Sequence, residues 1–216
     1  MRARALLLAG FVLAGCTTVG LHDNGARSRV DFAEPVTVRV CALLDDGITA
    51  VEAAALLETA WRDEVPAYGV RFTIVESRRW PRPAAGATAI MAALAREPLP
   101  PACDRLLAIL AVGVGDVVRT LLWPTPLGAS ALTHAYVLTG MPGVLHHELH
   151  HLLGCEHALS LARCYERIAA LKRARQDGFF PAWSRAAGRM VTSREEINRL
   201  LGGAGAATAA AVPDPA

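Results

Sequence analysis

The stretch Val144–His157 reads VLHHELHHLLGCEH and contains five of the seven histidines in the 216-residue chain. His147 and His151 are four residues apart, so on a helix they lie on one face and can hold one metal ion together. Glu148 directly follows the first of these histidines. This spacing predicts a helix that carries a metal site with a carboxylate beside it.

A third ligand follows shortly after the predicted helix. Gly154 can adopt the left-handed conformation that other residues resist, which ends the helix and turns the chain back. His157 would then supply a third nitrogen to the same ion. Three protein ligands leave the fourth zinc position open, and this arrangement is typical of a catalytic rather than a structural site.

The complete pattern H-E-x-x-H-x-x-G-x-x-H resembles the zinc motif of the metzincin metallopeptidases at every fixed position. The resemblance implies Zn²⁺ as cofactor, His147, His151 and His157 as metal ligands, and Glu148 as the general base of a zinc endopeptidase acting on a peptide or protein. It also implies an α+β fold of matrixin-like or archaemetzincin-like type. We expect a mixed four- to five-stranded sheet, a long helix, the zinc-motif helix and a small, mostly helical C-terminal part.

Other ligand sets remain open at this point. Glu166 can replace His157 as third ligand, as in gluzincin-like sites, and a Cys155 thiolate can do the same. His146 and His150 form a second four-spaced pair, for which we expect a solvent-facing or supporting role. A protein of another class, a zinc-binding envelope lipoprotein without hydrolytic activity, is the alternative function.

Composition limits the class of protein. A chain with 53% hydrophobic residues can bury a sizeable core. The 22 basic and 20 acidic residues are dispersed, so we expect no nucleic-acid partner. The short basic run 172–175 is expected to be a solvated helix end.

The N-terminus has the features of an export signal. Arg2 and Arg4 precede an apolar run, Ala5–Ala14, that is too short to span a bilayer comfortably. The run ends in LAGC, which resembles the lipobox of bacterial lipoproteins and makes Cys16 the expected lipidation site and membrane anchor. Thr17 in the next position favours the periplasmic face of the outer membrane. The alternative is an ordinary secretory signal that is cleaved near the end of the apolar run.

Four cysteines remain after Cys16, in a compartment that permits disulfides. They allow three pairings. We favour a Cys155–Cys164 bond, which would hold the loop after Gly154, together with Cys41–Cys103, although a buried free thiol at Cys41 is the alternative. The expected organisation is a signal peptide at 1–15, a tether at 16–34, the peptidase domain at 35–201 and a disordered tail at 202–216.

The secondary structure is expected to run strand, helix, strand, strand, strand, zinc-motif helix. The strands are predicted at Val36–Leu44, Val70–Glu76, Leu106–Val112 and Ala129–Leu138, and Arg78–Pro101 between the second and third is predicted as a surface excursion. Thr49 is predicted to cap the first helix, and Pro142 suits the first turn of the zinc-motif helix.

The metzincin resemblance adds two expectations outside the motif. The strand before the zinc helix lies at the sheet edge in that family, so Ala129, Ala131 and Thr133 are candidates for main-chain contacts with extended substrate. Met190 is the candidate for the methionine turn beneath the metal, with a core filler as its alternative. No tyrosine follows Met190, unlike in some metzincin families.

Overall fold

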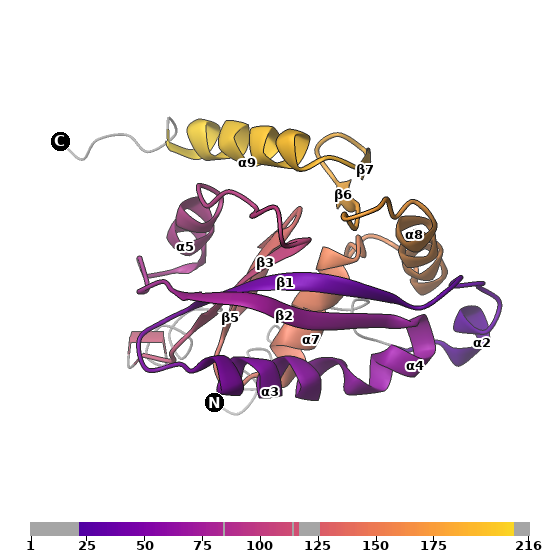
Figure 1. The fold of residues 1–216 in the computed structure, drawn as a ribbon, viewed down its shortest axis with the longest axis horizontal. Coiled ribbons are helices and arrows are strands. Elements are labelled where there is room, and N and C mark those ends of the chain that lie inside the picture. Colours follow the sequence, from indigo (N-terminus) through magenta and orange to yellow (C-terminus); the bar gives the residue numbers. More distant parts are fainter. Residues whose placement is uncertain (1–21, 84, 114, 117–125, 210–216) are drawn as a thin grey trace, which may run out of the picture.

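The computed structural model describes residues 22–83, 85–113, 115–116 and 126–209 and contains a mixed five-stranded sheet in the order β2-β1-β3-β5-β4 (Figure 1). Four strands are parallel, and β4 runs antiparallel to β5 at one edge. The sheet consists of β1 (Val36–Leu44), β2 (Val70–Arg79), β3 (Arg105–Leu110), β4 (Gly128–Ala131) and β5 (His134–Leu138). The helices are α2 (Asn24–Arg27), α3 (Ala50–Trp61), α4 (Val65–Tyr68), α5 (Ala87–Leu94), α7 (Pro142–Leu152), α8 (Leu161–Arg173) and α9 (Arg194–Ala209), with a 3₁₀ turn, η1, at Arg62–Glu64 and a small ribbon of β6 (Ala182–Ser184) and β7 (Arg189–Val191).

Both faces of the sheet are covered, so its central strands are apolar on both sides. In β1, Val38, Val40 and Ala42 pack in a cluster with α3, α7 and α8, whereas Cys41 and Leu43 pack in a second cluster with α5 and α9. This division follows the two-residue repeat of a strand. The sheet therefore holds α7, the histidine-bearing helix, on the same side as α3 (Figure 1).

The first two predicted elements are confirmed. β1 spans Val36–Leu44, and the helix after it begins where predicted, with Thr49 as its N-cap. The Thr49 side chain accepts a hydrogen bond from the Glu52 backbone, while the Glu52 carboxylate accepts one from the Thr49 backbone. This reciprocal pair satisfies donors that a helix start otherwise leaves unpaired.

The prediction of one strand over Ala129–Leu138 is wrong. The segment forms a hairpin in which β4 and β5 pair around a tight turn at Leu132 and Thr133. Leu132 has a φ of 56°, a left-handed conformation that the turn imposes on a residue other than glycine. Of these two strands, only β4 lies at an edge of the sheet. β5 pairs with β4 on one side and with β3, in parallel, on the other.

The predicted tether 16–34 is corrected over its described part, residues 22–34. Asp23 caps α2 and its backbone N–H donates to the Tyr165 hydroxyl of α8 across 3.0 Å. Ala26 is buried, and Phe32 packs against Tyr68 with ring centroids 5.2 Å apart. This segment therefore belongs to the folded domain, because its apolar side chains cover part of the core.

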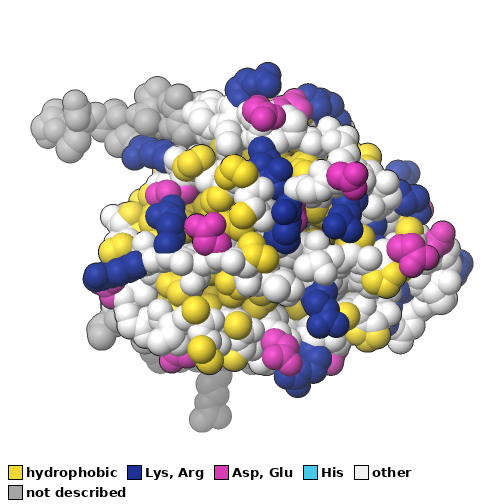
Figure 2. All heavy atoms as spheres, viewed as in Figure 1, with side chains coloured by type: hydrophobic (Ala, Val, Ile, Leu, Met, Phe, Trp, Pro, Cys, Tyr) yellow, Lys and Arg dark blue, Asp and Glu magenta, His cyan; other side chains and the backbone are white. Residues whose placement is uncertain are grey.

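The expected signal peptide and the lipidation site Cys16 lie outside the described residues. Within the described part of the chain, no helix has the length and apolar character needed to cross a membrane. On the face shown in Figure 2, acidic and basic side chains are interspersed among apolar ones.

Two further segments differ from their predictions. The excursion Arg78–Pro101 contains α5, whose Ile90 and Leu94 are fully buried in the second cluster, so it covers a face of the sheet. The helix at the C-terminus continues through Gly202 to Ala209, so the first half of the tail predicted to be disordered is helical. The alanines between the glycines of this segment favour helix enough to extend it.

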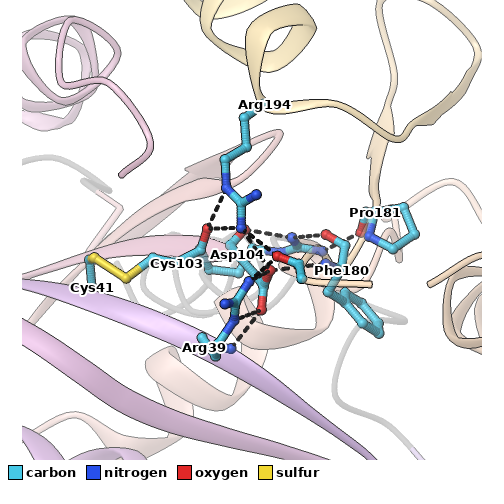
Figure 3. A network of polar contacts seen from close by, with 9 residues as sticks. Arg39, Cys41, Cys103, Asp104, Phe180, Pro181 and Arg194 are labelled. Carbon is cyan, nitrogen blue, oxygen red and sulfur yellow. Dashed lines mark hydrogen bonds and ion pairs between the residues drawn. A yellow bond between two sulfur atoms is a disulfide. The ribbon is translucent and has the colours of Figure 1, made fainter. Parts of the chain in front are cut away.

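A buried ionic network joins β3 to the C-terminal part (Figure 3). Asp104 accepts hydrogen bonds from the Arg39 guanidinium and from the Phe180 backbone N–H, both at 2.9 Å. Arg105 is fully buried and donates Nε–H to the carbonyl of Leu152, 3.0 Å away, in the last turn of α7. A cation there satisfies a carbonyl that the helix leaves unpaired and complements the helix dipole.

Candidate metal centre

Three histidine side chains converge beside the last turns of α7. The Nε2 atoms of His147 and His151 are 3.0 Å apart, and His157 Nε2 lies 3.0 Å from the first and 3.2 Å from the second. The first two come from one helix face, as the four-residue spacing predicts. The third comes from the segment after the helix, so the predicted ligand set is brought together.

The donor set fits a zinc ion. Tetrahedral zinc with Zn–N bonds of about 2.0–2.1 Å separates its ligand nitrogens by roughly 3.3 Å, close to the spacing of these three atoms. Burial lowers the pKa of His151 to about 4, with a smaller opposing contribution from its hydrogen bond to a backbone carbonyl, so this imidazole is in the neutral form that binds metal. The histidine triad is thus a possible metal-binding group.

The orientation of His151 is fixed from its far side. Its Nδ1 lies 2.6 Å from the carbonyl oxygen of Cys155 and donates to it, which leaves Nε2 unprotonated and facing the other two histidines. Cys155 is held in turn by a disulfide to Cys164, near the start of α8. Both disulfides, this one and Cys41–Cys103, have the pairing favoured from the sequence.

Gly154 adopts the predicted left-handed conformation, with a φ of 85°. A Cβ at this position would lie 2.9 Å from Arg167 Cδ and 3.0 Å from Trp183 Cβ, so the chain has no room for a side chain here. Arg167 donates to the Gly154 carbonyl across 2.9 Å and stacks over the Trp183 ring at 3.8 Å. This turn directs the chain towards His157.

Glu148 follows His147 in α7 and is buried, with 5% of its surface exposed. Its Oε2 has no hydrogen-bond partner among the described residues. Burial raises the pKa of Glu148 to about 7, and a hydrogen bond with the Ser130 side chain opposes this shift. A carboxylate with a free buried oxygen and a pKa near neutrality is suited to accept a proton from a water molecule next to the metal position.

The edge strand β4 packs closely against Glu148, which sequence reasoning did not detect. A Cβ on Gly128 would lie 2.7 Å from Val144 Cγ1 and 3.1 Å from Glu148 Cγ, so only glycine permits this approach. Ser130, two residues on, presents its hydroxyl to the same carboxylate. The sequence feature that could have indicated this packing is the presence of Gly128 and Ser130, two residues apart, in the segment just before the zinc-motif helix.

The candidates for substrate main-chain contacts are corrected. Leu138 N–H donates to the Leu127 carbonyl across 3.0 Å, which makes this a hydrogen-bonded pair of the antiparallel ladder. Because such pairs alternate, the backbone groups of Ala129 and Ala131 point towards β5, and those of the buried Gly128 and the half-buried Ser130 point away from it. Thr133 lies in the buried turn and hydrogen-bonds through its hydroxyl to the ring of His134, so it does not reach the edge.

The alternative ligands are not placed at the triad. Glu166 is exposed on α8, and Cys155 is bonded to Cys164 and has no free thiolate. His150 is buried, with Nδ1 donating to the His146 carbonyl at 2.9 Å, so this histidine supports the helix and does not face solvent.

Met190 lies within strand β7, not in a turn. It pairs with Trp183 of β6 and is partly buried against the larger apolar cluster, which also includes Leu149 and Leu152 of α7. Met190 is therefore located on the ribbon that flanks the Gly154 turn, since Trp183 contacts that turn.

In comparisons with known proteins, no protein-family model matches the chain and no curated protein shows significant similarity to it.

Proposed function

We propose that this protein is a zinc-dependent endopeptidase of the metzincin type. The observation that carries the proposal is the convergence of three histidine Nε2 atoms, 3.0–3.2 Å apart, together with the buried carboxylate of Glu148, the residue after His147 in α7. A purely structural zinc site has no use for such a carboxylate, because structural sites are closed by a fourth protein ligand.

The residues of the site have separate roles in this proposal. The three histidines would hold a zinc ion, and this ion would supply a bound water of lowered pKa and polarisation of the scissile carbonyl. Glu148 accepts a proton from the attacking water and passes it to the leaving amine. Ser130 orients the Glu148 carboxylate through its hydroxyl, and Cys155 orients His151 through its carbonyl.

The edge strand provides a surface for extended substrate. Backbone N–H and C=O groups of the half-buried Ser130 point away from β5, so a peptide that pairs with β4 by strand addition would bond there. Because Gly128 and Ser130 contact Glu148, a peptide bound along this edge passes beside the general base. This arrangement supports endopeptidase activity on unfolded or extended segments.

The proposed location is the cell envelope, with the lipid anchor on Cys16 and the enzyme at the periplasmic face of the outer membrane. The support is the lipobox-like sequence LAGC and the two disulfides, which persist in oxidising compartments. Metabolic labelling with a fatty-acid analogue, compared between the natural chain and Cys16→Ala, tests the anchor.

The test of function compares Glu148→Gln with the natural protein in a mass-spectrometric peptide-library cleavage assay combined with metal analysis. We expect about one zinc ion per chain to be retained at the triad, because all three ligands are unchanged, and cleavage to be lost. The matched control is Glu166→Gln, which changes an exposed glutamate on α8 and is expected to keep both properties. Undiminished cleavage by Glu148→Gln would falsify this mechanism.

The second candidate is a zinc-binding envelope lipoprotein that binds a partner without hydrolysis. It is favoured only by the exposure of His157, which leaves one side of the metal position open to a partner's ligand. Zinc binding by the natural protein without cleavage of any library peptide would support it over the peptidase.

A further inference from the structure

A second group of metal-binding side chains lies on another face of α7. Its members are His146 of α7, Glu64 of η1 and His22 of the N-terminal segment, and their ligand atoms all lie within 4.8 Å of one another. Glu64 Oε1 is 3.0 Å from His146 Nε2 and 3.2 Å from His22 Nε2. Three segments far apart in the sequence therefore contribute one donor atom each to a common point.

Glu64 is the central member, and its environment leaves it incompletely compensated. Only 2% of its surface is exposed, and its Oε2 has no hydrogen-bond partner among the described residues. The nearest described cation to Oε2 is Arg27, whose guanidinium lies 3.8 Å away. Burial of an ionised carboxylate is costly unless it is paired and hydrogen-bonded.

The surroundings of the group are largely apolar and aromatic. The Trp61 ring lies 5.9 Å from the His146 ring and 5.0 Å from the His150 ring. His150 is occupied by the carbonyl of His146 and by the Tyr68 hydroxyl, so it closes the site from inside and does not add a ligand. His22 is exposed and leaves the site open to solvent on one side.

We propose that His22, Glu64 and His146 form a second zinc site, distinct from the histidine triad. Two imidazoles and one carboxylate are a donor set that zinc accepts, and the open side leaves room for a water as fourth ligand. A divalent cation would also place a positive charge closer to the buried Glu64 carboxylate than Arg27, whose guanidinium lies 3.8 Å from Oε2. The free Oε2 gives the carboxylate the capacity for a second bond to the ion or to its water.

The site would fasten the N-terminal segment to the domain. His22 lies six residues after Cys16. Zinc bound here would join that segment to η1 and α7, adding to the hydrogen bond between Asp23 and Tyr165. The role we assign is therefore to hold the N-terminal segment in place. Three protein ligands and a water distinguish this site from structural zinc sites closed by four protein ligands. This role does not depend on the peptidase proposal.

The experiment measures zinc bound to the purified full chain by equilibrium dialysis and elemental analysis. We expect about two zinc ions per chain in the natural protein, about one in His22→Gln, about one in His157→Ala and none in the double variant. Glutamine keeps a hydrogen-bonding group but is a poor zinc ligand, and His22 is exposed, so this variant should fold. Ser28→Ala, an exposed change in the same segment, is the control and should keep about two.

A second measurement isolates the proposed site. Added zinc should raise the melting temperature of His157→Ala and should not raise that of His157→Ala/His22→Gln, because ligand binding to the folded state stabilises it. Two results would overturn the proposal. In the first, His22→Gln binds as many zinc ions per chain as the natural protein. In the second, the natural protein binds one zinc ion and His157→Ala binds none. Either result would leave the peptidase proposal to be judged by Glu148→Gln alone.

Discussion

His151 Nδ1 donates a hydrogen bond to the carbonyl oxygen of Cys155 across 2.6 Å. The acceptor is a backbone group four residues later, and its position depends on the Cys155–Cys164 disulfide. Orientation of a ligand imidazole by an outer hydrogen bond raises its basicity and fixes its tautomer. The Cys155–Cys164 disulfide therefore contributes to the geometry of the candidate metal centre as well as to stability.

Removal of this disulfide should weaken metal binding. For Cys155→Ser/Cys164→Ser we expect zinc affinity at the triad to fall about 10- to 100-fold, the range for loss of an outer-shell partner. Competition with a chromophoric chelator measures the affinity. Cys41→Ser/Cys103→Ser is the control, because that bond closes a longer loop, 62 residues against 9, but does not hold a ligand. It should lower stability more and zinc affinity less.

A methyl group on Gly128 should disturb the general base without removing the metal. Gly128→Ala places a Cβ 2.7 Å from Val144 Cγ1, 3.0 Å from the Tyr136 carbonyl oxygen and 3.1 Å from Glu148 Cγ, so Val144 must shift and Glu148 must move by a few tenths of an ångström. We expect kcat/KM for a cleaved peptide to fall roughly 10- to 100-fold, with zinc content unchanged. Gly143→Ala, in the first turn of α7 with open space around its Cβ, should keep full activity. Equal losses in both variants would contradict this account.

Loss of charge at Asp104 should destabilise the fold. Asp104→Asn keeps the shape of the side chain but leaves Arg39 without its buried partner, and the cost should be about 3 kcal/mol in the free energy of unfolding. Urea denaturation at neutral pH measures it. Asp46→Asn breaks the exposed pair with Arg79 and should show no measurable change, since surface ion pairs contribute little.

Stability should fall on acidification because His134 is buried in its neutral form. Its Nε2 donates to the Glu97 carbonyl across 2.8 Å, and its Nδ1 accepts from the Thr133 hydroxyl across 2.9 Å. Burial lowers the pKa of His134 from 6.5 to about 4, so between these values the unfolded chain binds a proton that the folded chain does not.

The contribution of His134 is therefore fully present above about pH 6.5 and is lost as the pH falls to about 4, by about 3 kcal/mol at most. Urea denaturation across this range, in the presence of a chelator so that metal release plays no part, should show the loss. His134→Gln should make the dependence less steep, and a part should remain because burial also lowers the pKa values of His150 and His151 to about 4. A profile that has the same slope with and without the histidine would show that another group is responsible.

The local elements followed from local sequence. The Thr49 cap, the strand Val36–Leu44 and the left-handed Gly154 depend on backbone preferences and short-range hydrogen bonds, which neighbouring residues determine. The histidine spacing on α7 is of the same kind, because helix geometry places residues four apart on one face.

The hairpin of β4 and β5, the packing of the 22–34 segment and the contacts of Gly128 and Ser130 with Glu148 depend on the tertiary structure. In each case the relevant partner is distant in sequence: β3 for β5, α8 for Asp23, and α7 for β4. Apolar periodicity shows that a segment is buried but not which surface buries it. The sequence by itself therefore determined the three histidines and the carboxylate. Only the tertiary structure, by closing distant segments around α7, decided what orients them, which strand packs against Glu148 and that a second group of possible metal ligands forms around Glu64.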